Sequence, residues 1–452
     1  MTRFLRLALP ALALAAAARA ADPVIPFERY RLPNGLTVIL SEDHRLPQVS
    51  VNIWYHVGAA NQAPGRSGFA HLFEHMMFSG SKHVQPSPFK FLEAIGVAGG
   101  SMVNGSTSFD RTNYFEVVPS NELATALWIE SDRMGFLLDT LDQKKLQVQR
   151  DVVSNERRQS YENRPYGLTF LRTCSLLFPS PHPYYECVIG SIPEIQAASV
   201  EDLRAFFREW YGPDDASLAI VGDFDPREAK DLVERYFGPI PAGPAPVRRD
   251  LPQPALAGVV RETLEDPVAE VPRLDLVWTG VRHYTDEEAA GDVLAAVLGG
   301  GKTSRLYRSL VFDRQVASSA DAENATYGLG GWFQISAEAK EGVAAKDLLP
   351  LVQAAVEDLK NDGPTVEEVE RAKRQFIAEK VRAVEPIGSH HGGRGDLLNR
   401  YQTYLGDPGW LGKDLARYRA VTPEAVKAFA LKYLPDGRRI ELVTVPKPKA
   451  GK

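Results

Sequence analysis

The strongest constraint on the fold of this chain of 452 residues is an internal repeat. Each half opens with a proline and an alternating strand that runs through a Trp, at residues 46–60 and again at 271–284. Each half closes with an amphipathic helix that leads through a turn into a β-rich run, at 203–222 and 426–445. Corresponding segments are separated by nearly the same number of residues. A repeat of this length indicates two copies of one structural unit.

Within each half, strands with period-two patterning alternate with long helical segments. Asn34 and Gly35 lie between two such strands, which is typical of a β-hairpin. Residues 365–384 have the pattern of a charged amphipathic helix with Thr365 at its N-cap. We therefore predict an α+β fold of two homologous domains, each a largely antiparallel sheet covered by helices.

A proline-rich polar stretch at 238–258 divides the sequence almost in half and is typical of an interdomain linker. We place the first domain at 21–240, the linker at 241–258 and the second domain at 259–448. A chain of this length, with 44% apolar residues, can fill more than one hydrophobic core.

Residues 1–20 have the three parts of a secretory signal peptide: two arginines, an apolar run at 7–17, and small residues ending at Ala20. A membrane anchor is the alternative, but the run is shorter than the ~20 residues that a span requires. We expect cleavage after Ala20, export to the periplasm, and no stable membrane anchor afterwards.

The net charge of −6 and the pI near 5.9 come from charges of both signs spread along the chain. No basic stripe is present of the kind that a phosphate backbone requires, so nucleic acid is excluded as a partner.

Cys174 and Cys187 are too few for a cysteine-built zinc site. In an exported protein they can form a disulfide, and three prolines in the intervening span allow the chain to bend back. Two free buried thiols remain the alternative.

The stretch 65–83 holds two histidines four residues apart in an apolar helical segment. Positions i and i+4 of a helix share one face, so His71 and His75 can point at one spot, with Glu74 beside it. The spacing H-x-x-E-H reverses the zinc-protease signature H-E-x-x-H, whose Glu is the general base. Such a site hydrolyses amides, because zinc lowers the pKa of water toward ~7. The alternative is two ordinary helix histidines and a solvated acid.

This kind of site requires a third protein ligand, and the candidate is Glu156. It lies in a helical run whose apolar residues we expect to face a core: Val148, Val152 and Val153. The alternative is a surface salt bridge from Glu156 to Arg157 or Arg158.

Three segments in order, GFAHLFEHMMFSGSKH, GGSMVNGSTSFDRTNYFEVVP and RDVVSNERRQSYENRPYG, resemble the M16 family of zinc metallopeptidases, which includes pitrilysin, insulysin and the mitochondrial processing peptidase. With the duplicated halves and GGGKTSRLYRSL at 299–310, the resemblance covers nearly the whole mature chain and points to the two-domain bacterial subfamily. It implies that the domains enclose a cavity. It also implies one zinc per chain, held in the first domain by His71, His75 and Glu156, with Glu74 as the base, and a second domain without metal.

The resemblance also gives a role to residues 99–118. In the family this is an edge strand on which a peptide substrate lies as an added strand. The implied substrate-binding residues are Asn104, Gly105, Ser106 and Thr107. An ordinary covered edge strand is the alternative.

The chain departs from the family pattern at a position that precedes the third ligand. The family often has a glutamate seven residues before the third ligand, where this chain has Gln149. A neutral amide carries no proton but can hydrogen-bond a ligand or water, so Gln149 is a supporting residue of the site.

The second departure lies after residue 310. Complete members carry an Arg and, seven residues on, a Tyr that bind substrate and stabilise the oxyanion, and this chain has Val311 and Ser318 in those places. Losing one oxyanion donor typically costs about a hundredfold in rate. We therefore expect a second M16-type subunit that supplies the Arg and Tyr, unless Arg282 or Tyr284 substitutes within the chain.

Two interpretations follow. One is a periplasmic zinc endopeptidase that cuts peptides or unfolded segments in a closed chamber, as the metal-bearing subunit of a heterodimer. The other is a catalytically silent M16-like subunit with a structural or scaffold role. A silent subunit has no reason to retain all four metal-site residues, so the sequence favours the peptidase.

Overall fold

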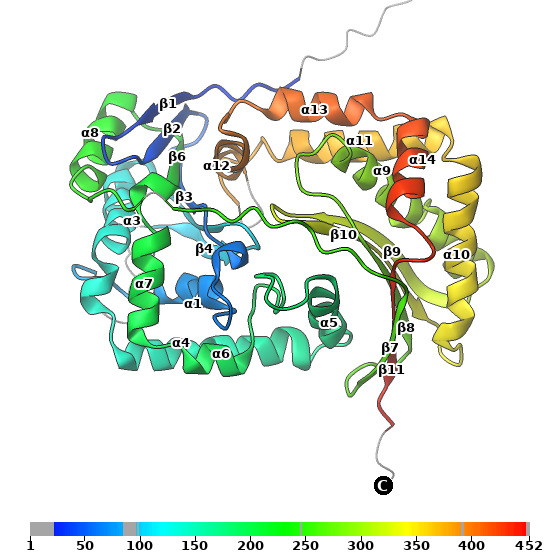
Figure 1. The fold of residues 1–452 in the computed structure, drawn as a ribbon. Coiled ribbons are helices and arrows are strands. Elements are labelled where there is room, and N and C mark those ends of the chain that lie inside the picture. Colours follow the sequence, from blue (N-terminus) through cyan, green and yellow to red (C-terminus); the bar gives the residue numbers. More distant parts are fainter. Residues whose placement is uncertain (1–21, 85–95, 97–98, 245, 390–392, 449–452) are drawn as a thin grey trace, which may run out of the picture.

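The computed structural model of the chain describes residues 22–84, 96, 99–244, 246–389 and 393–448. Two sheets, each with its own helices, lie side by side (Figure 1). The predicted signal peptide falls outside the described residues. Within those residues, no helix combines the length and the apolar content that a membrane crossing requires.

The sheet of the first half has six strands in the order β1-β2-β6-β3-β5-β4. Their bounds are β1 Glu28–Arg31, β2 Thr37–Glu42, β3 Gln48–Tyr55, β4 Ser101–Thr107, β5 Thr112–Pro119 and β6 Ala216–Gly222. The predicted hairpin is confirmed: β1 and β2 are antiparallel, and Gly35 takes a φ of 98° in the turn between them. Strand β4 forms one edge of this sheet.

The sheet of the second half has five strands in the order β7-β11-β8-β10-β9. Their bounds are β7 Val260–Asp266, β8 Arg273–Thr279, β9 Ala317–Thr326, β10 Gly331–Ala339 and β11 Ile440–Pro446. This order repeats the first sheet strand for strand once β1 is left aside. Both sheets contain one parallel pair, β2 with β6 and β7 with β11, among antiparallel neighbours. The predicted repeat and the largely antiparallel character are confirmed.

Helices cover both sheets. In the first half they are α1 Phe69–Met76, α3 Leu123–Phe136, α4 Gln143–Arg157, α5 Gly167–Leu177, α6 Ile192–Ala197, α7 Val200–Trp210 and α8 Pro226–Phe237. In the second half they are α9 Glu288–Gly299, α10 Ala345–Asp362, α11 Val366–Arg382, α12 Arg394–Leu405, α13 Leu411–Ala420 and α14 Pro423–Tyr433. Thr365 caps α11 as predicted, and Glu368 completes its capping box.

One helix of each half packs against the sheet of the other half. Helix α12 packs on β3 and β6 of the first sheet, where the Asn399 amide donates to the Asn52 carbonyl at 2.8 Å. Helix α5 packs beside β11 of the second sheet, where the hydroxyls of Thr169 and Thr444 lie 2.6 Å apart. The halves are therefore interlocked and not merely linked by 241–258.

Cys174 of α5 and Cys187 form a disulfide, which decides the alternative that the sequence left open. Both side chains are fully buried. The bond ties α5 to the loop that returns toward the start of α1, where Gly190 packs on the backbone of Gly68.

Candidate metal centre

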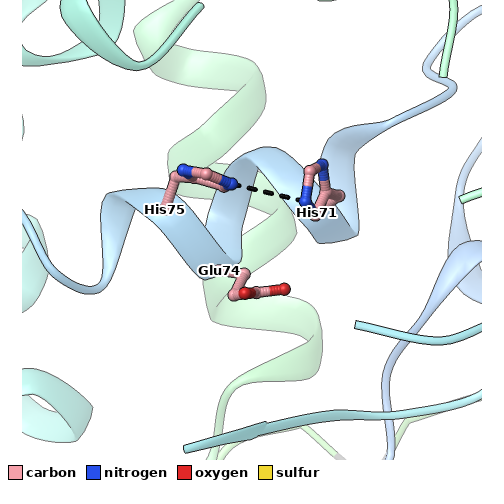
Figure 2. Close-up of side chains that lie close together, drawn as sticks. All are labelled: His71, Glu74 and His75. Carbon is pink, nitrogen blue, oxygen red and sulfur yellow. Dashed lines mark hydrogen bonds between the residues drawn. The ribbon is translucent and has the colours of Figure 1, made fainter. Parts of the chain in front are cut away.

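Helix α1 follows β3 and precedes β4 along the chain, and it carries the H-x-x-E-H motif. Gly68 precedes it with a φ of 80°, and a Cβ atom there would lie 2.8 Å from the Ile189 carbonyl, so only glycine fits this approach. The two histidine rings leave the same side of the helix with their Nε2 atoms facing each other, as Figure 2 shows. The local geometry predicted from the spacing is confirmed.

Glu156, near the end of α4, completes a convergent cluster with the two histidines. The Nε2 atoms of His71 and His75 are 3.3 Å apart, and Glu156 Oε2 lies 3.1 Å from His75 Nε2 and 3.6 Å from His71 Nε2. Zinc bonds of 2.0–2.1 Å in tetrahedral geometry place neighbouring ligand atoms about 3.3 Å apart. The three atoms therefore stand at the spacing of zinc ligands, and their chemistry, two imidazoles and a carboxylate, suits that metal.

The electrostatic environment favours the metal-binding forms of His71 and Glu156. Burial lowers the pKa of His71, although Glu74 and Glu156 act in the opposite direction. Burial acts to raise the pKa of Glu156, but the hydrogen bond to His75 and the two imidazoles outweigh it and lower that pKa. A neutral imidazole and an ionised carboxylate are the states that bind a metal.

The alternative assignment of Glu156 does not hold. Among its neighbours, Arg157 pairs with Glu162, and Arg158 donates to the Asn155 side chain. The carboxylate of Glu156 instead faces the two histidines.

The predicted orientation of α4 is wrong in part. Val153 is buried, but the side chains of Val148 and Val152 are 42% and 41% exposed. Val148, Val152 and Glu156 follow one another at intervals of four and so share a helix face. The face that carries Glu156 is the open one, while Val153 lies on the packed side.

Glu74 projects from α1 beside the two histidines (Figure 2), and one of its carboxylate oxygens lies within 4.8 Å of a ring nitrogen of each. Its carboxylate is buried and accepts a hydrogen bond of 2.6 Å from Thr107 Oγ1 of β4. The Glu74 carboxylate is thus held between the histidine pair and the edge strand.

The four predicted substrate-binding residues do not share one environment. Asn104 is exposed, and Gly105 packs where a Cβ atom would lie 3.0 Å from Tyr114. Ser106 donates to the side chain of Asn113 at 2.7 Å. Thr107 alone of the four hydrogen-bonds a residue of the motif. That contact gives no sequence signal, because 33 residues separate its partners.

Gln149 lies beside the end of α1 and touches the site indirectly. Its buried amide donates to Ser79 Oγ at 2.9 Å, and Ser79 Oγ lies 3.5 Å from the carbonyl of His75. Gln149 therefore fixes the turn after α1 and has no hydrogen bond to a ligand side chain among the described contacts.

Val311 and Ser318 lie in the second half, far along the chain from the histidines. Val311 is partly buried against the second core, and Ser318 is the second residue of the edge strand β9. The two residues considered as substitutes are engaged elsewhere. Arg282 pairs with Asp250 at 2.9 Å and donates to the Leu251 carbonyl, while Tyr284 packs edge-on against Trp410.

Comparison with known proteins gives two family matches. Residues 37–170 match the family described as Insulinase (Peptidase family M16), and residues 197–376 match the family described as Peptidase M16 inactive domain. The first match contains the three predicted metal ligands, and the second contains Val311 and Ser318.

Individual proteins agree with these matches. The chain is 28% identical over 364 residues to the zinc protease PqqE of Helicobacter pylori, covering 79% of this chain and 80% of the relative. The crystal structure of a protease from Helicobacter pylori has a TM-score of 0.84 and 25% identity, over 94% of this chain and all of that one. The first half of the periplasmic protease PqqL from Escherichia coli has a TM-score of 0.73 at 20% identity, over 95% and 94% of the two chains, a likeness of fold alone.

Proposed function

The chain belongs to the M16 family of peptidases, and on this premise we propose that it is a zinc-dependent endopeptidase that hydrolyses peptides or unfolded polypeptide segments. The observation that carries the proposal is the convergence of His71, His75 and Glu156 at the spacing of zinc ligands. The comparisons support a zinc protease in general, and the geometry supports the particular residues.

His71, His75 and Glu156 would hold one zinc ion per chain. When bound, zinc supplies Lewis acidity that polarises the scissile carbonyl and makes water a nucleophile at neutral pH. The chain's own contribution is to fix three ligands on two packed helices, α1 and α4, and to favour the neutral imidazole of His71 and the ionised carboxylate of Glu156.

Glu74 is the proposed general base. It lies beside the histidine pair, where it can accept the proton of the attacking water and return it to the leaving amine. Thr107 holds the carboxylate through its hydroxyl. A base with a fixed position needs less reorganisation when the proton moves.

The edge strand β4 is the proposed peptide site. An edge strand offers unpaired N–H and C=O groups, and a peptide that pairs with them gains affinity without strict sequence choice. The contact between Thr107 and Glu74 joins the end of this strand to the proposed base, so a bound peptide would pass the site of hydrolysis.

This chain has the residues that would bind zinc but lacks the Arg and Tyr of complete family members, which suggests a heterodimer. Val311 and Ser318 cannot replace an Arg and a Tyr, and the alternatives Arg282 and Tyr284 are engaged in other contacts. A second copy of this chain carries the same Val311 and Ser318. We therefore propose a partner chain of M16 type that retains the Arg and Tyr and presents them to the site of this chain.

A catalytically silent structural subunit is the second candidate, and the missing Arg and Tyr favour it. The match to the inactive-domain family covers 197–376, outside the helices that carry the ligands. The retained His71, Glu74, His75 and Glu156 weigh against this candidate.

The proposed location is the periplasm. Residues 1–20 have the pattern of a signal peptide, and the structurally similar PqqL is described as a periplasmic protease.

The test assays this chain alone, a candidate partner alone and their mixture against one unstructured peptide. We expect cleavage by the mixture, loss of cleavage with a chelator, and recovery with added zinc. Glu74→Gln should keep the metal and abolish turnover, whereas Glu201→Gln, an exposed control on α7, should change neither. A Glu74→Gln mixture that cleaves at the normal rate would refute the assignment of Glu74 as the general base, and a wild-type mixture that cleaves nothing would refute the peptidase assignment. Full activity of this chain alone would refute only the heterodimer.

A further inference from the structure

A groove of about 500 Å³ opens at the start of the edge strand β4. Its wall combines residues of both halves and is mainly apolar: Leu46, Met102, Val117, Pro386, Ile387 and Gly388. The side chains of Leu46 and Met102 are 64% and 42% exposed. Two large apolar side chains that are exposed in one concave surface are typical of a site that binds an apolar group.

Met102 is turned into this groove by an irregular backbone. The register of β4 against β5 shifts between Ser101 and Asn104, so one extra residue bulges out of the ladder. Met102 there takes a φ of 54°, a conformation that side chains other than glycine rarely adopt. Bulges beside active sites commonly re-aim a side chain, and strain of this kind persists where it serves a function.

The opposite wall comes from Pro386, Ile387 and Gly388, which follow α11. A Cβ atom at Gly388 would lie 2.5 Å from Ser50 Oγ, so this segment is pressed directly against the first sheet. The carbonyl of Pro386 accepts a hydrogen bond of 2.9 Å from the Arg394 amide, at the start of α12. The wall is therefore formed before any ligand binds.

The charged groups at the rim neutralise one another. Asp43 forms ion pairs with both Arg45 and Arg394, and the carboxylate of Glu385, which also lines the groove, balances the second arginine. No net charge is left to select a charged occupant, so the chemistry of the groove favours an apolar one.

The groove lies at a defined distance from the proposed base. Thr107 marks the position of Glu74 on β4, and Met102 precedes it by five residues. One of these residues is taken up by the bulge, so at about 3.3 Å per residue the four regular steps span roughly 13 Å along the strand. A peptide added to the β4 edge has the same rise, so the residue at the groove would be four to five residues from the bond that is cleaved.

We propose that this groove binds a large apolar side chain of the substrate, about five residues from the scissile bond, and that Met102 and Ile387 form its walls. The inference rests on the proposed peptidase function and adds a sequence preference to it. Met102 is suited to the task, because its flexible side chain adapts to Leu, Ile, Met or Phe.

The test uses the active assembly and a series of otherwise polar peptides with one cleavable bond. A single Leu is moved through the positions three to seven residues from that bond, on each side, with Ser as the reference. We expect kcat/KM to rise about tenfold with Leu at one position, close to the fifth, because a buried apolar side chain is worth about that factor.

Two variants tie the preference to the groove. Met102→Gly removes the side chain and relieves the positive φ, and Ile387→Ser makes the opposite wall polar. Both should abolish the Leu preference, measured in each variant as the ratio of kcat/KM for the Leu peptide to kcat/KM for the Ser reference. Leu431→Ser, which alters an exposed leucine on α14, is the matched control and should retain the preference.

The failures are distinguishable. No cleavage of any peptide by the wild-type assembly would refute the proposed function and this inference with it. Normal cleavage with no Leu preference at these positions, or with a preference that survives in Met102→Gly and Ile387→Ser, would overturn the groove alone.

Discussion

Thr107 Oγ1 donates a hydrogen bond of 2.6 Å to Glu74 Oε2, and this bond joins the edge strand β4 to the helix α1. The strand proposed to bind the peptide is therefore hydrogen-bonded directly to the carboxylate proposed as the base. A shift of β4 would move the base relative to His71 and His75.

The first prediction concerns this bond. Thr107→Val keeps the shape of the side chain and removes the donor, so kcat should fall about ten- to a hundredfold, the value of a hydrogen bond to a charged group. KM and zinc content should change little, because the variant leaves the ligands and the strand edge intact. Thr107→Ser restores a hydroxyl and should recover most of the rate. A normal kcat in Thr107→Val would show that Thr107 does not position Glu74.

The second prediction concerns the metal. Purified protein should contain about one zinc per chain, and His71→Ala or Glu156→Gln should lower that content sharply, because two ligands hold zinc far less tightly than three. Metal analysis of dialysed protein measures it. His44→Ala, an exposed histidine outside the site, is the control and should keep full occupancy. Full zinc occupancy in His71→Ala would contradict the assigned ligand set.

The third prediction restores the missing pair. Val311→Arg combined with Ser318→Tyr would let one copy of the chain offer both groups to another copy, so the activity of this chain alone should rise tenfold or more. The control moves the same residues by one position, Phe312→Arg with Ser319→Tyr, which turns the tyrosine to the other face of β9. Equal activity of the two double variants and the wild-type chain would argue against a missing Arg and Tyr as the defect.

The fourth prediction concerns stability and pH. Burial raises the pKa of Asp292 to about 6, against the hydrogen bonds that it accepts from Tyr418 and Asn324. The folded state therefore holds this proton more tightly than the unfolded state. The resulting stabilisation is complete below about pH 4 and is lost as the pH rises through 6, a loss on the order of 2–3 kcal/mol.

Asp292→Asn mimics the protonated form at every pH. It should raise the Tm at pH 7.5 and raise it only about half as much at pH 5, as measured by thermal unfolding. Asp231→Asn, an exposed control on α8, should show no such difference between the two pH values. A Tm change in Asp292→Asn that is the same at both pH values would rule out the buried carboxyl as the cause.

The sequence by itself determined what depends on neighbours along the chain. The i, i+4 geometry of a helix placed His71 and His75 on one face, Asn34 and Gly35 set a hairpin, and Thr365 capped a helix. The repeat fixed the two-sheet architecture, because two similar patterns fold into the same strand order. The resemblance to a known family then supplied Glu156, which spacing alone left open.

Only the tertiary structure decided the contacts between distant segments. It placed Glu156 Oε2 3.1 Å from His75 Nε2, joined Cys174 to Cys187, and brought Thr107 to Glu74. It also showed that Val148 and Val152 are exposed, against the prediction. Apolar residues lie on more than one face of α4, and the sequence does not show which of these faces is covered. Hydrophobic patterning acts within a few residues, whereas these contacts depend on how two sheets and their exchanged helices pack, and that packing is set by the whole chain at once.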